Sequence, residues 1–60
     1  MTWAEVIRKI TKKGARFKEH DKKHDVYWNP KTGAEVEIPR HSSKEAPTGT
    51  VHSILRKLNL

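Results

Sequence analysis

The sequence contains no cysteine among its 60 residues. This absence excludes disulfide bonds, thiolate metal ligands and a cysteine nucleophile. Four histidines are present, but none has the clustered spacing of a zinc site, so we predict no structural metal. Glycine-rich phosphate loops, paired catalytic carboxylates and serine nucleophile motifs are also missing. The sequence therefore offers none of these three kinds of site.

Long apolar stretches are missing as well. No segment approaches the roughly 20 apolar residues that span a bilayer, and no signal-peptide pattern is visible. With Met1 at the start of the sequence, we expect a cytoplasmic protein without a membrane partner. A chain of this length allows a single domain over residues 1–60. Such a small domain buries only about 60% of the surface that its unfolded chain exposes.

Acidic residues are in the minority, with 7 against 13 basic residues and a net charge of +6. A basic surface favours a polyanionic partner, because lysine and arginine neutralise phosphates and release counterions. A solvated helix face that keeps a small protein soluble accounts for the charge equally well. The excess is concentrated in the first 24 positions, in Arg8, Lys9, Lys12, Lys13, Arg16, Lys18, Lys22 and Lys23.

The hydrophobic pattern predicts one helix near each end of the chain. Thr2 and Glu5 have the spacing of a capping box, and Gly14 supplies a stop signal. Between them, apolar residues from Trp3 to Ile10 recur at helical spacing. The same spacing recurs from Val51 to Leu58 and predicts the second amphipathic helix.

Three short strands are predicted between the helices, at residues 15–19, 24–28 and 34–38. Residues 20–23 form the first connection, 29–33 a turn with proline and glycine, and 40–49 a loop. We therefore predict an α+β fold, with two helices packed on one face of a three-stranded antiparallel sheet. The predicted core consists of Trp3, Val6, Ile7, Ile10, Phe17, Val36, Ile38, Val51, Ile54, Leu55 and Leu58.

His24 is the main candidate for chemistry, because it lies where a basic loop enters the second strand. An imidazole titrates near neutrality, with a pKa of about 6.5, and can act as a general acid or base. Lys22 and Lys23 beside it can hold a phosphate. Together these groups suit RNA cleavage through attack of the 2′-hydroxyl on the adjacent phosphorus. On local chemistry alone, an ordinary surface histidine at a strand edge is the more frequent case.

Other candidates give weaker signals. Arg40 and His41 follow the third strand and are candidate phosphate contacts, although a basic pair there is more often simply solvated. We expect plain surface roles for His20 and His52. The aromatic pair at positions 27 and 28 suits stacking on bases, or burial in so small a domain.

The whole chain resembles the HicA toxins, small mRNA interferases with a double-stranded-RNA-binding-domain-like fold. Both the individual segments and the spacing between them match, over nearly all 60 residues. The segments that carry the resemblance are Glu5–Ile7, Lys23–Tyr27, Asn29–Gly33, Ile38–His41, Pro47–Thr50 and Ser53–Leu58.

This resemblance implies a metal-independent endoribonuclease toxin of a type II toxin–antitoxin system. It implies that His24 is catalytic, that no cofactor is needed, and that a HicB-like antitoxin covers the active site. Many members carry a small pair such as Gly-Ser before this histidine, whereas Lys22 and Lys23 stand here. Glycine takes backbone angles that lysine resists, so we expect a different loop.

Two alternatives to an RNA-cleaving toxin remain open at this point. One is a non-catalytic RNA-binding module that uses the same basic surface without cutting. The other is a protein-interaction domain that docks a partner on its sheet. Salt-sensitive retention of RNA of unchanged length would indicate the first. Binding to an acidic partner without RNA affinity would indicate the second.

Overall fold

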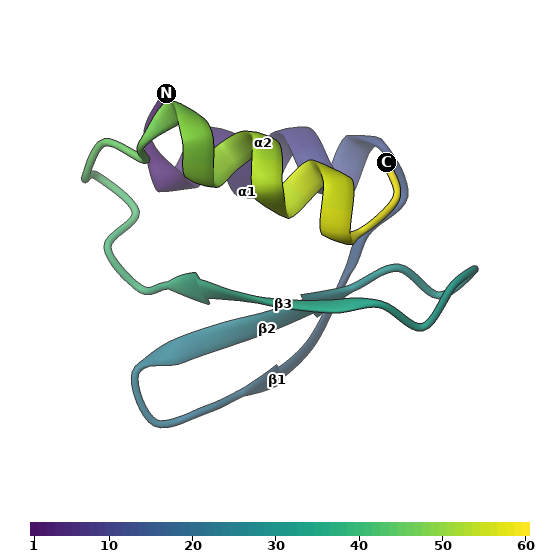
Figure 1. Ribbon diagram of the computed structural model, residues 1–60. Coiled ribbons are helices and arrows are strands. Elements are labelled where there is room, and N and C mark those ends of the chain that lie inside the picture. Colours follow the sequence, from purple (N-terminus) through teal and green to yellow (C-terminus); the bar gives the residue numbers. More distant parts are fainter.

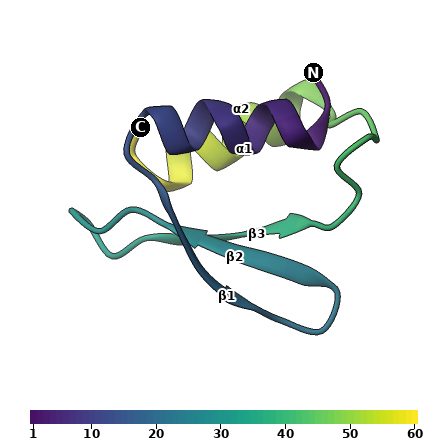
Figure 2. The ribbon, with the colours of Figure 1, turned by 180° about the vertical axis from the view of Figure 1, so that it is seen from behind.

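The computed structural model describes residues 1–60 as two layers, a pair of helices over an antiparallel sheet (Figure 1). The order is α1 (Trp3–Lys12), β1 (Arg16–His20), β2 (His24–Trp28), β3 (Glu35–Pro39) and α2 (Thr48–Lys57). The sheet order is β1-β2-β3, and α1 and α2 lie side by side over one of its faces (Figure 2). This is the predicted α+β fold, with the arrangement of a double-stranded-RNA-binding domain.

The first helix begins and ends where its capping signals predict. The amide of Glu5 donates to the Thr2 hydroxyl over 3.3 Å, and the amide of Thr2 donates to the Glu5 carboxylate over 2.7 Å. Gly14 has a φ of +120°, a left-handed conformation that side chains other than glycine resist. The capping box and the glycine stop are therefore confirmed.

The loop before α2 does more than connect two elements. Its carbonyls at Ser42 and Lys44 accept hydrogen bonds of 3.0 Å from the amides of Ala4 and Trp3. First-turn amides have no partner within their own helix, so the loop satisfies donors that would otherwise be left open. We predicted α2 from the apolar repeat that starts at Val51, whereas the helix begins three residues earlier, at Thr48.

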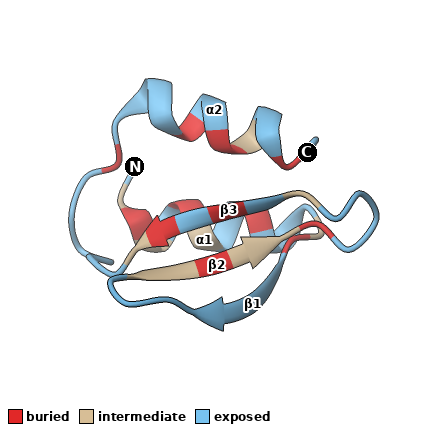
Figure 3. Ribbon diagram, turned by 60° about the horizontal axis from the view of Figure 1, so that its bottom comes forward, coloured by how far each residue is buried: buried red, intermediate tan, exposed pale blue.

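The core lies between the helices and β3 (Figure 3). Eight of the predicted core residues are buried, and Ile7 and Leu55 pack partly buried against them. Ala15 and Ala46 are also buried in this cluster, although we did not predict them. The buried residues of the core cluster are Trp3, Val6, Ile10, Ala15, Val36, Ile38, Ala46, Val51, Ile54 and Leu58.

The prediction that Phe17 belongs to the core is wrong. Phe17 is 47% exposed. All residues of β1 are exposed, because the helices cover the β3 side of the sheet (Figure 3). Phe17 instead packs edge-on against Tyr27, with ring centroids 5.7 Å apart. Its register opposite Tyr27 places Phe17 on the helix-facing side of the sheet, but strand alternation could not show that the helical layer ends before β1.

Asn29 joins the turn between β2 and β3 to the end of α2. Its side-chain amide donates to the carbonyl of Leu58 over 2.7 Å, and its side-chain oxygen accepts from the amide of Lys31 over 3.0 Å. Gly33 completes the turn with a φ of +79°. Asn29 is buried, so one side chain both shapes the turn and ties it to the second layer.

Candidate functional site at the hairpin end of the sheet

His24 is the first residue of β2 and emerges at the β1–β2 end of the sheet. Antiparallel pairing places it opposite Pro39, and Val26 opposite Glu37. Side chains alternate between the faces of a strand, so His24, Val26 and Trp28 share one face. The core residues Val36 and Ile38 belong to the other face, which the helices cover. We call the face of His24 the open face.

The imidazole of His24 is half-buried and makes no hydrogen bond within the chain. None of the surface cavities is lined by His24, so it lies on an open surface and not in a pocket. Small-molecule sites are usually concave, whereas an open surface suits a long polymer. The backbone carbonyl of His24 accepts a hydrogen bond from the amide of Asp21 over 2.8 Å, which closes one side of the turn before it.

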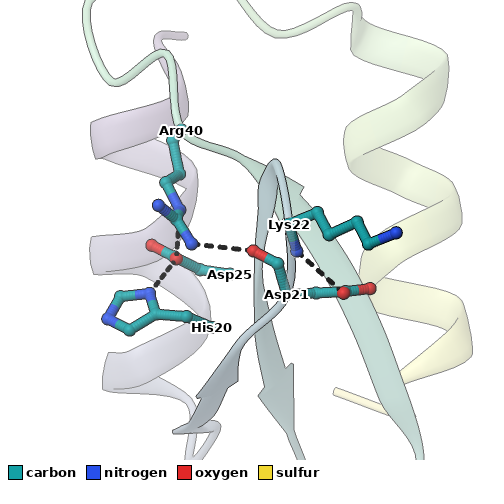
Figure 4. Close-up of polar contacts among 5 residues, drawn as sticks. All are labelled: His20, Asp21, Lys22, Asp25 and Arg40. Carbon is teal, nitrogen blue, oxygen red and sulfur yellow. Dashed lines mark hydrogen bonds and ion pairs between the residues drawn. The ribbon is translucent and has the colours of Figure 1, made fainter.

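Lys22 and Lys23 form the two-residue connection between the paired residues Asp21 and His24. Both are exposed, and neither ammonium group has an intramolecular partner. Figure 4 shows the side chain of Lys22 pointing away from Asp25 and Arg40. Neither lysine has a positive φ, so the chain turns here without the angles that favour glycine. Two free cations therefore directly precede the free imidazole in the chain.

A second group of polar side chains lies on the opposite face of the same hairpin end (Figure 4). Nδ1 of His20 lies 2.6 Å from Oδ1 of Asp25, a contact that requires a proton on Nδ1. Nε of Arg40 donates to the same carboxylate oxygen over 3.0 Å. The hydrogen bond from His20 and the charges of His20 and Arg40 hold the pKa of the Asp25 carboxyl below its ordinary value.

A β-bulge at Lys18 makes this group possible. Phe17 pairs with Tyr27 and Glu19 with Val26, so one extra residue stands in β1 between the two pairs. Without the bulge, residues 17 and 20 would point to opposite faces of the strand. With it, the rings of Phe17 and His20 lie on one face with centroids 4.9 Å apart.

The structure separates the predicted site residues into two groups. His24, Lys22 and Lys23 lie together at the hairpin end. Arg40 has its guanidinium on Asp25 and on the carbonyl of Asp21, and His41 is exposed in the loop that follows β3. Sequence reasoning missed Asp25 and assigned only a surface role to His20. The positions of His20 and Asp25 on either side of a predicted connection were visible in the sequence. Whether the two side chains face each other depends on the strand register, which the bulge sets.

The aromatic candidates also occupy different faces. Tyr27 packs partly buried against the core, so it is not free to stack on a base. Trp28 lies on the open face, where the ammonium of Lys18 is 5.6 Å from its ring centroid. That ammonium also pairs with Glu35, and the pair raises the pKa of Lys18. A cation already occupies one face of the indole.

Neither a metal centre nor a membrane span is apparent. No group of three or more His, Cys, Asp or Glu side chains is arranged to hold a metal ion. Neither helix combines the length and apolar character that crossing a bilayer requires.

The arrangement at the hairpin end offers one imidazole and two ammonium groups. The imidazole can exchange a proton, and the ammonium groups can hold an anion.

Comparison with protein families gives one match. The family model described as the HicA toxin of bacterial toxin–antitoxin systems matches residues 3–60. This range contains both helices, all three strands and the hairpin end with His24. Comparison with curated proteins gives no match.

Proposed function

The chain belongs to the HicA family of bacterial toxin–antitoxin toxins, and from this premise we propose that it is a metal-independent endoribonuclease that cleaves mRNA. Toxins of this family are generally ribonucleases, so membership implies an RNA target and an antitoxin partner. The observation that carries the catalytic proposal is His24, a half-buried imidazole with no intramolecular partner beside two free lysines. We further propose that residues 1–60 act as a single toxin domain.

In the proposed reaction, His24 acts as a general base and takes the proton of a ribose 2′-hydroxyl. The 2′-oxygen then forms a bond to the adjacent phosphorus, and the bond from phosphorus to the 5′-oxygen breaks. The leaving oxygen takes up a proton to become a 5′-hydroxyl, and the other product ends in a 2′,3′-cyclic phosphate. The nucleophile belongs to the substrate, so this route needs no metal-bound water. A positioned general base contributes about 10²- to 10⁴-fold to such a rate.

Lys22 and Lys23 are the proposed phosphate-binding residues. Their ammonium groups are exposed and unpaired, and a phosphate passing through the transition state gathers negative charge that they can stabilise. His41 is a weaker candidate contact, exposed just beyond β3. Arg40 was predicted as a further phosphate contact, but its guanidinium already donates to Asp25 and to the carbonyl of Asp21.

We also propose that the antitoxin is HicB-like and covers His24. His24 lies outside all of the surface cavities and is partly exposed, so a protein partner that binds the open face can shield it. Because the proposed substrate is mRNA, the proposed site of action is the cytoplasm.

The test is cleavage of a 5′-labelled RNA by the purified chain, with and without a metal chelator. We expect cleavage in both conditions, and we expect products with a cyclic phosphate and a 5′-hydroxyl. A substrate with 2′-deoxyribose at the cleaved position should stay intact, because it lacks the nucleophile.

His24→Ala should lower the cleavage rate by about 10²-fold or more, as expected for the loss of a general base. The matched control is His52→Ala, which removes an exposed histidine from α2. Wild-type protein that leaves RNA intact would overturn the proposal, as would a His24→Ala variant that cleaves at the wild-type rate. Retention of uncut RNA would indicate the non-catalytic binding module instead.

A further inference from the structure

The two residues between Asp21 and His24 make an unusual hairpin turn. Two-residue hairpins favour turns with positive φ at one or both central residues, because their twist matches that of the strands. Lys22 and Lys23 both have negative φ, so this turn belongs to neither favoured type. The amide of Asp21 donates to the carbonyl of His24, but the carbonyl of Asp21 accepts no backbone hydrogen bond. The turn therefore lacks half of its usual backbone closure.

Arg40 supplies the missing hydrogen bond. Its Nη2 donates to the carbonyl of Asp21 over 2.7 Å, and its Nε donates to the carboxylate of Asp25 over 3.0 Å. Arg40 directly follows Pro39, the cross-strand partner of His24. One guanidinium thus reaches from the end of β3 to β2 and to the β1–β2 turn (Figure 4). These contacts lie at the level of His24.

The carboxylate of Asp25 anchors this guanidinium. It is the residue next to His24, and its side chain is 21% exposed against 45% for Arg40. His20 contacts the same oxygen from β1. Because Asp25 follows His24 in β2, a shift of Asp25 moves the backbone that carries the imidazole.

Building on the proposed role of His24, we propose that Arg40 is a positioning residue for that imidazole and not a phosphate contact. Arg40 closes the Asp21–His24 turn from the helix-facing side and leaves the open face to the substrate. The planar guanidinium holds two acceptors at fixed angles, which one ammonium group cannot do. Rates of oriented reactions fall steeply when a catalytic group is misplaced by about 1 Å.

Replacement by lysine separates the two roles of Arg40. Arg40→Lys keeps the positive charge, so a phosphate contact would be largely preserved. It cannot hold both Asp21 and Asp25, so a positioning role would be lost. We expect Arg40→Lys to lower kcat by about tenfold or more. The Kd for a non-cleavable 2′-O-methyl RNA should stay within about twofold of wild type, since phosphate contacts set that affinity. Arg56→Lys, an exposed position on α2, is the matched control.

Hydrogen exchange gives a readout that does not depend on catalysis. The amide of Asp21 is bonded to the carbonyl of His24, so loosening of the turn exposes it. In Arg40→Lys this amide should exchange about tenfold faster than in wild type, the effect expected for losing a charge-assisted hydrogen bond. Asp25→Asn, which keeps the size of the anchor but not its charge, should act in the same direction. Circular dichroism at the working temperature confirms that each variant is folded.

The inference is overturned if Arg40→Lys keeps the wild-type kcat while Arg40→Gln loses RNA affinity. It is also overturned if the Asp21 amide exchanges at the wild-type rate in Arg40→Lys. Wild-type protein that does not cleave RNA would instead contradict the proposed function. In that case, the exchange rate of the Asp21 amide in Arg40→Lys is the measurement that tests whether Arg40 orders the turn before His24.

Discussion

His24 and Asp25 are consecutive in β2, yet their side chains lie on opposite faces of the sheet and only that of Asp25 is hydrogen-bonded within the chain. The imidazole of His24 has no partner within the chain, whereas the carboxylate of Asp25 holds both His20 and Arg40. The alternation of a β-strand produces this separation. A free group for chemistry and a bonded group for rigidity therefore lie one residue apart.

The lysines beside His24 predict a specific dependence of RNA binding on salt. Each lysine that neutralises a phosphate on single-stranded RNA contributes about 0.7 to the slope of log K against log salt concentration. Lys22→Gln and Lys23→Gln should each reduce the slope by about that amount. The measurement is binding of a 2′-O-methyl RNA over a KCl series. Lys57→Gln, on α2, removes the same charge as a control. Slopes that both hairpin variants leave unchanged would contradict the assignment.

The carboxyl group of Asp25 predicts a loss of stability in acid. Its pKa in the folded protein is lowered by the hydrogen bond from His20 and by the charges of His20 and Arg40. A lowered folded-state pKa stabilises the protein above the unfolded value, about 3.9 for Asp, and this gain is lost as the pH falls through the folded pKa. Wild type should therefore unfold at a higher temperature than Asp25→Asn at pH 7, and the difference should shrink below about pH 4.

Thermal unfolding of both proteins from pH 7 to pH 2 checks this prediction. The comparison cancels the other carboxyl groups, including Glu5, whose pKa is lowered mainly by its hydrogen bonds with Thr2. A difference between wild type and Asp25→Asn that is the same at pH 7 and pH 2 would contradict it.

The side chain of Asn29 predicts a large effect from a small chemical change. Asn29→Asp keeps the oxygen that accepts from Lys31 but removes the amide that donates to Leu58. A buried carbonyl then loses its donor and faces a carboxylate. We expect a loss of about 1–3 kcal/mol in the free energy of unfolding. Chemical denaturation measures it. A free energy of unfolding that stays at the wild-type value would contradict the assigned role of Asn29.

Substitution by alanine should have opposite effects on stability at Gly33 and at Gly49. A Cβ at Gly33 or at Gly49 would have no atom within 4 Å, so packing does not distinguish them. Gly33 has a φ of +79°, whereas Gly49 lies in the first turn of α2. Gly33→Ala should cost about 1 kcal/mol or more, because alanine is strained in the left-handed region. Gly49→Ala should stabilise by up to about 1 kcal/mol, through helix propensity. Denaturant unfolding of both variants checks the sign of each effect.

Local patterns in the sequence determined most of the secondary structure. The capping box of Thr2 and Glu5, the stop at Gly14 and the turn from Asn29 to Gly33 are short-range signals, and each one is confirmed. They work because a cap or turn depends on the conformation of a few neighbouring residues. The resemblance that implies a catalytic His24 likewise rests on short segments in a fixed order, from Glu5–Ile7 to Ser53–Leu58.

Only the tertiary structure decided what surrounds His24. The bulge at Lys18 sets which residues of β1 meet β2, and the extent of the helices leaves Phe17 exposed. Arg40 and Asp21 lie 19 positions apart in the sequence, and their hydrogen bond depends on the register of all three strands. Such contacts depend on pairing between distant segments, which no short stretch of sequence contains. The sequence by itself thus identified the candidate imidazole, and the packed sheet decided which polar groups are bonded to one another beside it.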